Sequence, residues 1–369
     1  MNDCSSSSSA SPFESSPSAV ATDESDSPHS SLLLPNLPDD IALQCIARVP
    51  PFYHNELSLV SKSWLSMLRS TVFLSTCDRL NCSRHFLYFN VEIYGSSFKW
   101  FALDHNPKNP RNLYPVPPIP SQPIGSTFAV LGPKIYALGG LVNNTLSSAV
   151  WIFDSRFNRW ESGPKMHIGR KLAIAGVLNG KIYVMGGCGQ STNWAEVFDP
   201  VLGFWAPIPS PVEVTRRLFC ASAVMEEKFY ALAYYQGGVV FDPCDSSWRN
   251  APTELSLRWR GRVVVDGILY CYDGFGKIKG FDLKEGKWKE LKGVQRDSPA
   301  FIVDVVMANV GGRLFVLWVE NRNQTEISCS EVEVSKDSNG GLWGSIVWSE
   351  VILAVPVSSY IAACLAVEF

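Results

Sequence analysis

The sequence predicts a mainly β protein, built from a repeated strand unit and preceded by a short all-helical segment. Two observations carry this prediction. A Phe-Asp pair followed six residues after the Asp by Trp occurs four times between residues 153 and 288. Ahead of these repeats, apolar residues between Leu32 and Leu68 recur at helical spacing and are bordered by prolines.

The repeated unit has a nearly constant length. Its Asp/Trp pairs are Asp154/Trp160, Asp199/Trp205, Asp242/Trp248 and Asp282/Trp288, so that successive Asp residues lie 45, 43 and 40 residues apart. Periods in this range are typical of units that cannot bury their apolar faces alone and therefore stack into propellers or solenoids. Within each unit a tight turn separates two strands, at Gly132-Pro133, Asn179-Gly180, Glu226-Glu227 and Asp266-Gly267.

Composition narrows the class of protein. The 369 residues are 46% hydrophobic and carry a net charge of −3, which gives no indication of nucleic-acid or anionic-membrane binding. Ten cysteines without a Cys-x-x-Cys pair indicate buried thiols of a reducing compartment. The sequence shows neither a secretory signal nor an apolar run of about 18 residues. We therefore expect a soluble protein of the cytoplasm, the nucleus or both.

The chain begins with two different segments. Residues 1–31 are rich in Ser with few apolar residues, a composition that predicts a disordered tail. From Leu32 the pattern becomes helical: Pro38 with two following acids is a helix start signal, and Pro50-Pro51 ends that helix. Such a small helical core is marginally stable alone, so its apolar residues suggest a partner surface.

The order and spacing of these residues over about 32–77 resemble an F-box. Leu37-Pro-Asp-Asp-Ile41 is followed by Cys45-Ile-Ala-Arg-Val-Pro50 and then by Leu57-Ser-Leu-Val-Ser-Lys-Ser-Trp64. The resemblance implies docking to the Skp-type adaptor of a cullin ubiquitin ligase. Val60 and Trp64 are alternatively expected in the core of the F-box itself, and a helical bundle that caps the repeats is the structural alternative. The implied adaptor-binding residues are Leu37, Pro38, Ile41, Cys45, Val49, Leu57, Val60 and Trp64.

After a linker at 78–84, residues 85–369 resemble kelch repeats. Gly139-Gly140 and Gly186-Gly187 match the diglycine of that family, and the four late Trp residues match its Trp, which we expect to pack between blades. The third and fourth units lack the diglycine. The resemblance implies a six-bladed kelch β-propeller, with five or seven blades as alternatives. Propeller closure predicts that the apolar run Ile361–Phe369 completes the first blade.

Basic residues recur in the loops that lead into successive repeat units, and they form the predicted substrate site. Arg170 and Arg217 each lie 11 residues before the Lys of the second strand, at equivalent positions. Arginine suits carboxylate or phosphate partners, so we expect a target with an acidic or phosphorylated segment. In the alternative these arginines bridge blades through carboxylates or carbonyl groups. The residues are Arg170, Arg216, Arg217, Arg258 and Arg260.

Catalytic signals are scarce in the sequence. The five histidines are scattered, with only His167 in a suitable loop, and no phosphate loop, nucleophile elbow or metal-ligand run is present. We therefore predict no enzyme, cofactor or metal. An F-box joined to kelch repeats implies a substrate receptor of a Skp–cullin–F-box ubiquitin ligase that binds a protein target. The alternatives are an adaptor-binding protein outside a ligase and a kelch scaffold with a structural helical segment.

Overall fold

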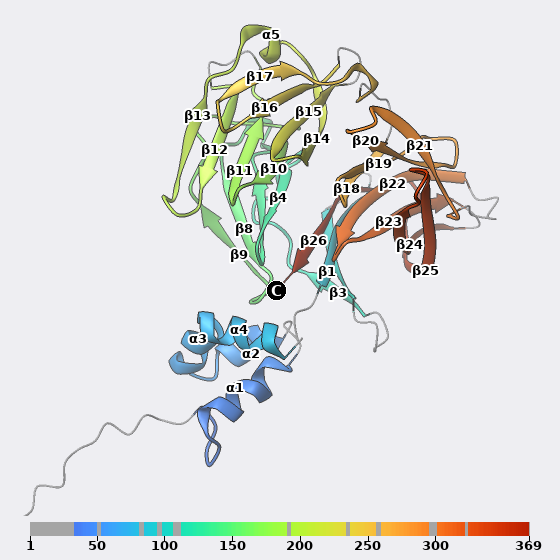
Figure 1. The fold of residues 1–369 in the computed structure, drawn as a ribbon. Coiled ribbons are helices and arrows are strands. Elements are labelled where there is room, and N and C mark those ends of the chain that lie inside the picture. Colours follow the sequence, from blue (N-terminus) through green and yellow to red (C-terminus); the bar gives the residue numbers. More distant parts are fainter. Residues whose placement is uncertain are drawn as a thin grey trace, which may run out of the picture.

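The computed structural model describes a helical segment followed by a ring of β-sheets (Figure 1). No helix within the described residues is long and apolar enough to cross a membrane. The described residues are 33–49, 53–80, 85–93, 98–105, 112–189, 193–233, 237–255, 260–294, 301–321 and 324–368.

Four short helices form the first unit. They are α1 (Asp39–Ala47), α2 (His54–Ser58), α3 (Lys62–Leu68) and α4 (Thr71–Arg79). Helix α1 begins directly after Pro38, as predicted, with Asp39 and Asp40 at its positive end. The helices share a small apolar core, which includes Ile46, Leu68 and Phe73.

Four of the sheets are separate four-stranded antiparallel blades. The first has the order β26-β1-β2-β3, the second β4-β5-β8-β9, the third β10 to β13 and the fourth β14 to β17. Their strands are β1 (His85–Ile93), β2 (Phe98–His105), β3 (Leu113–Val116), β4 (Thr127–Leu131), β5 (Lys134–Leu138), β8 (Val150–Asp154), β9 (Arg159–Gly163), β10 (Ile174–Leu178), β11 (Lys181–Met185), β12 (Ala195–Asp199), β13 (Phe204–Ile208), β14 (Phe219–Met225), β15 (Lys228–Ala233), β16 (Val239–Asp242), β17 (Ser247–Asn250) and β26 (Ser359–Glu368).

A fifth sheet has eight strands, in two antiparallel groups of four. The groups meet where Leu291 and Lys292 of β21 pair in parallel with Leu342 and Trp343 of β25. Its strands are β18 (Arg260–Val265), β19 (Ile268–Tyr272), β20 (Ile278–Asp282), β21 (Lys287–Lys292), β22 (Phe301–Val310), β23 (Arg313–Asn321), β24 (Thr325–Lys336) and β25 (Leu342–Val355). Small elements outside these sheets are β6 (Leu141–Val142), β7 (Thr145–Leu146), α5 (Val212–Thr215) and a 3-10 turn at Thr253–Leu255.

The chain closes the ring with its C-terminal strand. Strand β26 pairs antiparallel with β1, with Tyr88 opposite Leu365 and Phe86 opposite Val367. The prediction that this apolar run completes the first blade is therefore confirmed. The leading strands of the sheets are neighbours in the order β26, β4, β10, β14, β18, β22 and back to β26.

The repeated Trp residues tie each unit to the segment that leads into it. The indole nitrogen of Trp160 donates to the carbonyl oxygen of Pro117 at 2.8 Å, and that of Trp205 donates to Pro164 at 2.9 Å. Trp248 and Trp288 make the equivalent bonds to Pro209 and Glu254. The late Trp therefore has a structural role, as expected.

One glycine of the diglycine pair is required by a close approach between two blades. Gly139 has φ +67°, and a Cβ at this position would lie 2.4 Å from the carbonyl oxygen of Arg170. The neighbouring Gly140 donates its amide to the same oxygen at 2.7 Å. The loop that leads into the third blade thus packs directly against the diglycine of the second blade.

The helical segment lies under the propeller, near the C-terminus (Figure 1). Phe157, in the turn between β8 and β9, is 2% exposed and packs into the helical core beside Leu68 and Phe73. The guanidinium of Arg69 lies 5.3 Å from the centre of the Phe157 ring. A single propeller turn thus inserts its aromatic side chain between the helices.

Candidate functional site

Helix α1 has apolar residues on two sides. Ala42 and Ile46 are buried in the helical core, whereas Ile41 is 41% exposed and Cys45 is exposed. Ile41 and Cys45 are four residues apart and therefore lie on one helix face. The apolar residues of α1 are therefore divided between an inward face and an outward face.

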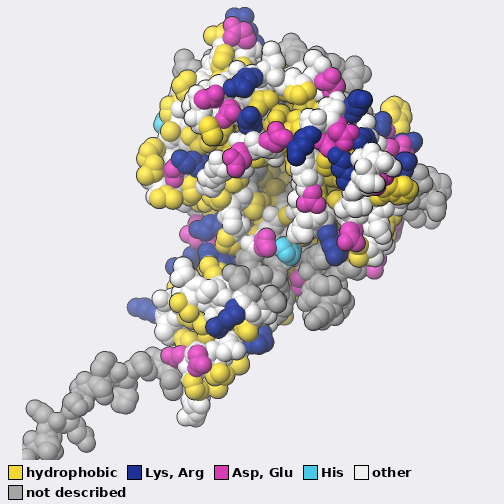
Figure 2. Space-filling model, in the orientation of Figure 1, with side chains coloured by type: hydrophobic (Ala, Val, Ile, Leu, Met, Phe, Trp, Pro, Cys, Tyr) yellow, Lys and Arg dark blue, Asp and Glu magenta, His cyan; other side chains and the backbone are white. Residues whose placement is uncertain are grey.

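The turn after α2 adds two further exposed apolar side chains. Leu59 is 79% exposed and Val60 is 61% exposed. Val60, which was a candidate for the core, instead points to solvent. Pro38 is exposed as well. We call Pro38, Ile41, Cys45, Leu59 and Val60 the apolar F-box residues; Figure 2 shows hydrophobic side chains at the surface of the helical segment. Exposed apolar groups in so small a unit are a feature of partner surfaces.

The remaining predicted adaptor residues are partly enclosed. Trp64 and Leu57 are half-buried and pack against the helical core. The indole nitrogen of Trp64 donates to the carbonyl oxygen of Leu33 at 2.9 Å, which ties the chain before α1 to α3. Leu37 and Val49 are half-buried too. These four side chains offer less surface to a partner than the apolar F-box residues do.

Arg170 was predicted to bind substrate. Its side chain is fully buried, so the structure contradicts this prediction. Its side chain is 0% exposed and forms an ion pair at 2.7 Å with Glu196, which is also 0% exposed. Burying a guanidinium is costly unless its donors are paired. The Nε of Arg170 has no partner among the described residues, but backbone oxygens bind its two terminal nitrogens. These oxygens belong to Gly186 at 2.8 Å, Trp194 at 2.7 Å and Asn193 at 2.6 Å. Arg170 thus binds carbonyl groups and a carboxylate, the groups that the alternative named, but all of these partners lie within the third blade and not across two blades.

Of the other predicted arginines, only Arg216 and Arg217 have described side chains. Arg217 is half-buried and donates to the carbonyl oxygen of Gly238 at 3.4 Å and to the Asn250 side chain at 3.1 Å. Arg216 is exposed. Arg258 lies outside the described residues, and so does the side chain of Arg260.

His167, the one histidine that the sequence places in a loop suited to a metal site, also contacts Glu196. Its Nδ1 lies 2.6 Å from Glu196 Oε2, and its backbone amide donates to the same oxygen at 2.9 Å. Glu196 is therefore held by two side chains, and it fixes the loop before β10. Among the residues that the structure describes, no group of three or more His, Cys, Asp or Glu side chains could hold a metal ion.

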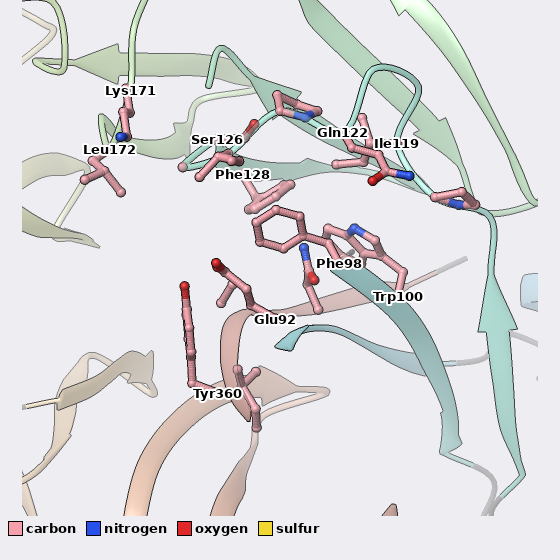
Figure 3. A pocket seen from close by; sticks show the side chains of 17 residues that line it. Glu92, Phe98, Trp100, Ile119, Gln122, Ser126, Phe128, Lys171, Leu172 and Tyr360 are labelled. Atoms are coloured by element: carbon pink, nitrogen blue, oxygen red, sulfur yellow. The ribbon is translucent and has the colours of Figure 1, made fainter. Parts of the chain in front are cut away.

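A pocket of about 400 Å³ lies between the first and second blades (Figure 3). Its walls come from β1, β2, β26 and the loop before β4, and they include the aromatic rings of Phe98, Trp100 and Phe128. Trp100 meets Phe128 edge to face, with 5.0 Å between ring centroids. Lys171, next to Arg170, lines its upper side. The volume and the aromatic lining are those of a ligand site.

Polar groups stand at the rim of this pocket. Tyr360 of β26 lies opposite Glu92 of β1 in the sheet. Burial, and after it a hydrogen bond to the Glu92 carboxylate, raises the pKa of Tyr360 to about 12. The pocket has no direct signal in the sequence, because its residues come from segments as far apart as Asn90 and Ala362. The one available indication was the basic pair at 170–171, of which Lys171 reaches it.

Comparisons with known proteins match both units of the chain. An F-box domain model matches residues 34–75, and the FKB95 kelch-repeats domain model matches residues 100–353. The chain belongs to the F-box/kelch-repeat family. It is 30% identical to the F-box/kelch-repeat protein At4g39550 of Arabidopsis thaliana, over 90% of this chain and 94% of the relative. It is 31% identical to At4g39240 of the same plant, over 92% of both chains.

Family membership gives the general kind of protein. An F-box joined to kelch repeats indicates a protein of the substrate-adaptor type, commonly a component of Skp–cullin–F-box complexes. The F-box suggests binding to a Skp-type adaptor, and the kelch domain suggests binding to a substrate. Proteins of this type are typically non-catalytic.

Proposed function

We propose that this protein is the substrate receptor of a Skp–cullin–F-box ubiquitin ligase and acts in the cytoplasm, the nucleus or both. Residues 32–77 form the F-box that docks the Skp-type adaptor, and the adaptor links the receptor to a cullin. Residues 85–369 form a six-bladed propeller, in which the eight-stranded sheet counts as two blades, and this propeller binds the protein to be ubiquitinated. The chain carries no catalytic group of its own; it raises the local concentration of the target.

The observation that carries this proposal is the outward face of the F-box. Ile41, Leu59 and Val60 are 41%, 79% and 61% exposed on a unit whose core is very small. Burying apolar side chains of this size against a partner stabilises by about 1.5 to 3 kcal/mol each. A closed helical bundle that only capped the propeller would not leave them in water, because its apolar residues would turn toward the sheets.

The proposal is tested by capture of purified partners. The full chain, bound to beads, is offered a plant Skp-type adaptor alone and then the adaptor with cullin. We expect both to be retained. Retention of the adaptor without cullin would instead support a role outside the ligase, and retention of neither would support a structural helical segment.

Two variants make that test specific. Ile41→Asp combined with Val60→Asp should abolish adaptor capture and leave the melting temperature unchanged, since both side chains are solvent-exposed in the free protein. The matched control is Val72→Asp, because Val72 on α4 is also 61% exposed but lies outside the apolar F-box residues. Equal loss of adaptor in the control would contradict the assignment of this surface.

A further inference from the structure

The pocket between the first two blades opens on the side of the propeller away from the F-box. It is lined by the start of β26 and by the residues before β4 and β10, where the leading strands begin. Phe157, which contacts the helices, lies in the turn between β8 and β9. Because neighbouring strands in a blade are antiparallel, that turn lies at the opposite ends of the strands. A target in this pocket would therefore not compete with the adaptor for space.

Two buried polar atoms in the pocket wall have no partner. Asn90 of β1 and Trp100 of β2 are 3% and 2% exposed, and both line the pocket. Among the described residues, neither Asn90 Oδ1 nor Trp100 Nε1 has a hydrogen-bond partner. A buried polar group without a partner is uncommon in folded proteins and costs stability. These two atoms thus indicate that a ligand completes the site.

The two unpaired atoms belong to neighbouring residues and are complementary. Asn90 lies directly opposite Trp100 in the β1–β2 pairing, so their side chains leave the same face of the sheet as near neighbours. One is a hydrogen-bond acceptor and the other a donor. A hydroxyl group can donate to the first and accept from the second.

The groups around this pair favour an aromatic ring on the hydroxyl. Phe98, two residues before Trp100 on the same face of β2, and Phe128, across the blade interface, present ring surfaces to the cavity (Figure 3). Aromatic rings pack well against such walls in edge-to-face and offset geometries. We propose that the pocket binds the phenol side chain of a tyrosine in the target polypeptide. This inference rests on the proposed function, because it specifies what the receptor's propeller recognises.

The rim favours a polypeptide over a free phenolic molecule. Two large apolar side chains at the pocket edge, Ile124 and Leu172, are 51% and 69% exposed. A molecule small enough to enter the cavity would leave them in water, whereas a peptide chain running across the mouth would cover them. A buried anchor surrounded by a water-excluding rim is the usual arrangement of an interaction hot spot.

The test uses the full chain, without adaptor, and a display library of random linear peptides. We expect selected peptides to share one tyrosine. Replacing that tyrosine by phenylalanine should weaken binding about tenfold, because both polar atoms lose their partner. In the double variant Asn90→Leu, Trp100→Phe we expect this preference to vanish or to reverse in favour of phenylalanine. Adaptor binding, measured on the same samples, should be unchanged in the variant.

Three results would overturn the inference about tyrosine. A selection without tyrosine, or a double variant that keeps its tyrosine preference, would show that the unpaired atoms do not read a phenol. Binding of p-cresol as tight as that of the best peptide would assign the pocket to a free phenol. Trp160→Phe is the control for folding, since Trp160 packs on Trp100 without lining the pocket, and it should keep the preference. Loss of adaptor capture by the wild-type protein would instead refute the proposed function and leave the peptide result intact.

Discussion

The F-box and the propeller differ in how completely they bury their side chains. The last strand of the propeller pairs with its first strand, and even an arginine and a glutamate are enclosed as a hydrogen-bonded ion pair. The F-box leaves Ile41, Leu59 and Val60 in water and has only a small core. The difference teaches that the propeller is a closed scaffold, whereas the F-box has an exposed apolar surface, which on the proposed function a second polypeptide covers.

Removal of the closing strand should have the largest effect on this contrast. Truncation after Val357 deletes β26 and leaves one edge of β1 without its partner over the whole strand. We expect the propeller to aggregate or to melt at least about 15 °C lower, measured by circular dichroism and gel filtration. Removal of residues 1–30 is the control and should change neither readout. A truncated protein that melts normally would contradict ring closure by β26.

Breaking the buried ion pair should have the next largest effect. Arg170→Ala leaves the Glu196 carboxylate buried with one partner fewer, which we expect to cost about 3 to 5 kcal/mol in urea unfolding. Arg216→Ala, at an exposed site in the loop that leads into the next blade, should change stability by less than about 0.5 kcal/mol. If Arg170→Ala instead kept full stability and lost its target, Arg170 would be a binding residue.

A smaller effect is expected at the contact between the two units. Phe157→Ala removes the propeller ring that packs among the helices beside Leu68 and Phe73. We expect the helical segment to lose about 2 kcal/mol, below the range for a fully enclosed core phenylalanine, because the segment keeps its own helix contacts. Calorimetry should then show the helices melting before the propeller. A single unchanged transition would mean that the contact does not couple them.

The repeat spacing was enough to predict the blades. The residue after each predicted turn begins the second strand of its unit. These residues are Lys134, Lys181, Lys228 and Ile268, which begin β5, β11, β15 and β19. The turns before them have positive φ even at Glu226 and Glu227, where sequence chemistry is least favourable. Local turn geometry and strand pairing are short-range properties, so a single sequence carries them. Blade closure was predictable as well, because a ring needs its two ends to meet.

The binding surface was harder to predict because burial depends on contacts far apart in the chain. The recurring arginines were compatible with an exposed binding surface and equally with buried structural contacts. Only the position of Glu196 decides that Arg170 has a structural role. In the same way Ile41 and Ile46 look alike in a helical pattern, yet they face opposite sides of α1. The Asn90–Trp100 pair gave no signal, since neither residue belongs to a motif.

Hydrogen exchange with and without a Skp-type adaptor tests the contrast between the two units most directly. On adding a saturating amount of purified adaptor to the full chain, we expect the amides of α1 and of residues 57–60 to gain strong protection from exchange, since partner binding stabilises the F-box. Amides of the inner strands, such as those of β10 and β14, should not change. Protection confined to the propeller, or no change at α1, would contradict the view that the F-box is the surface that a partner completes.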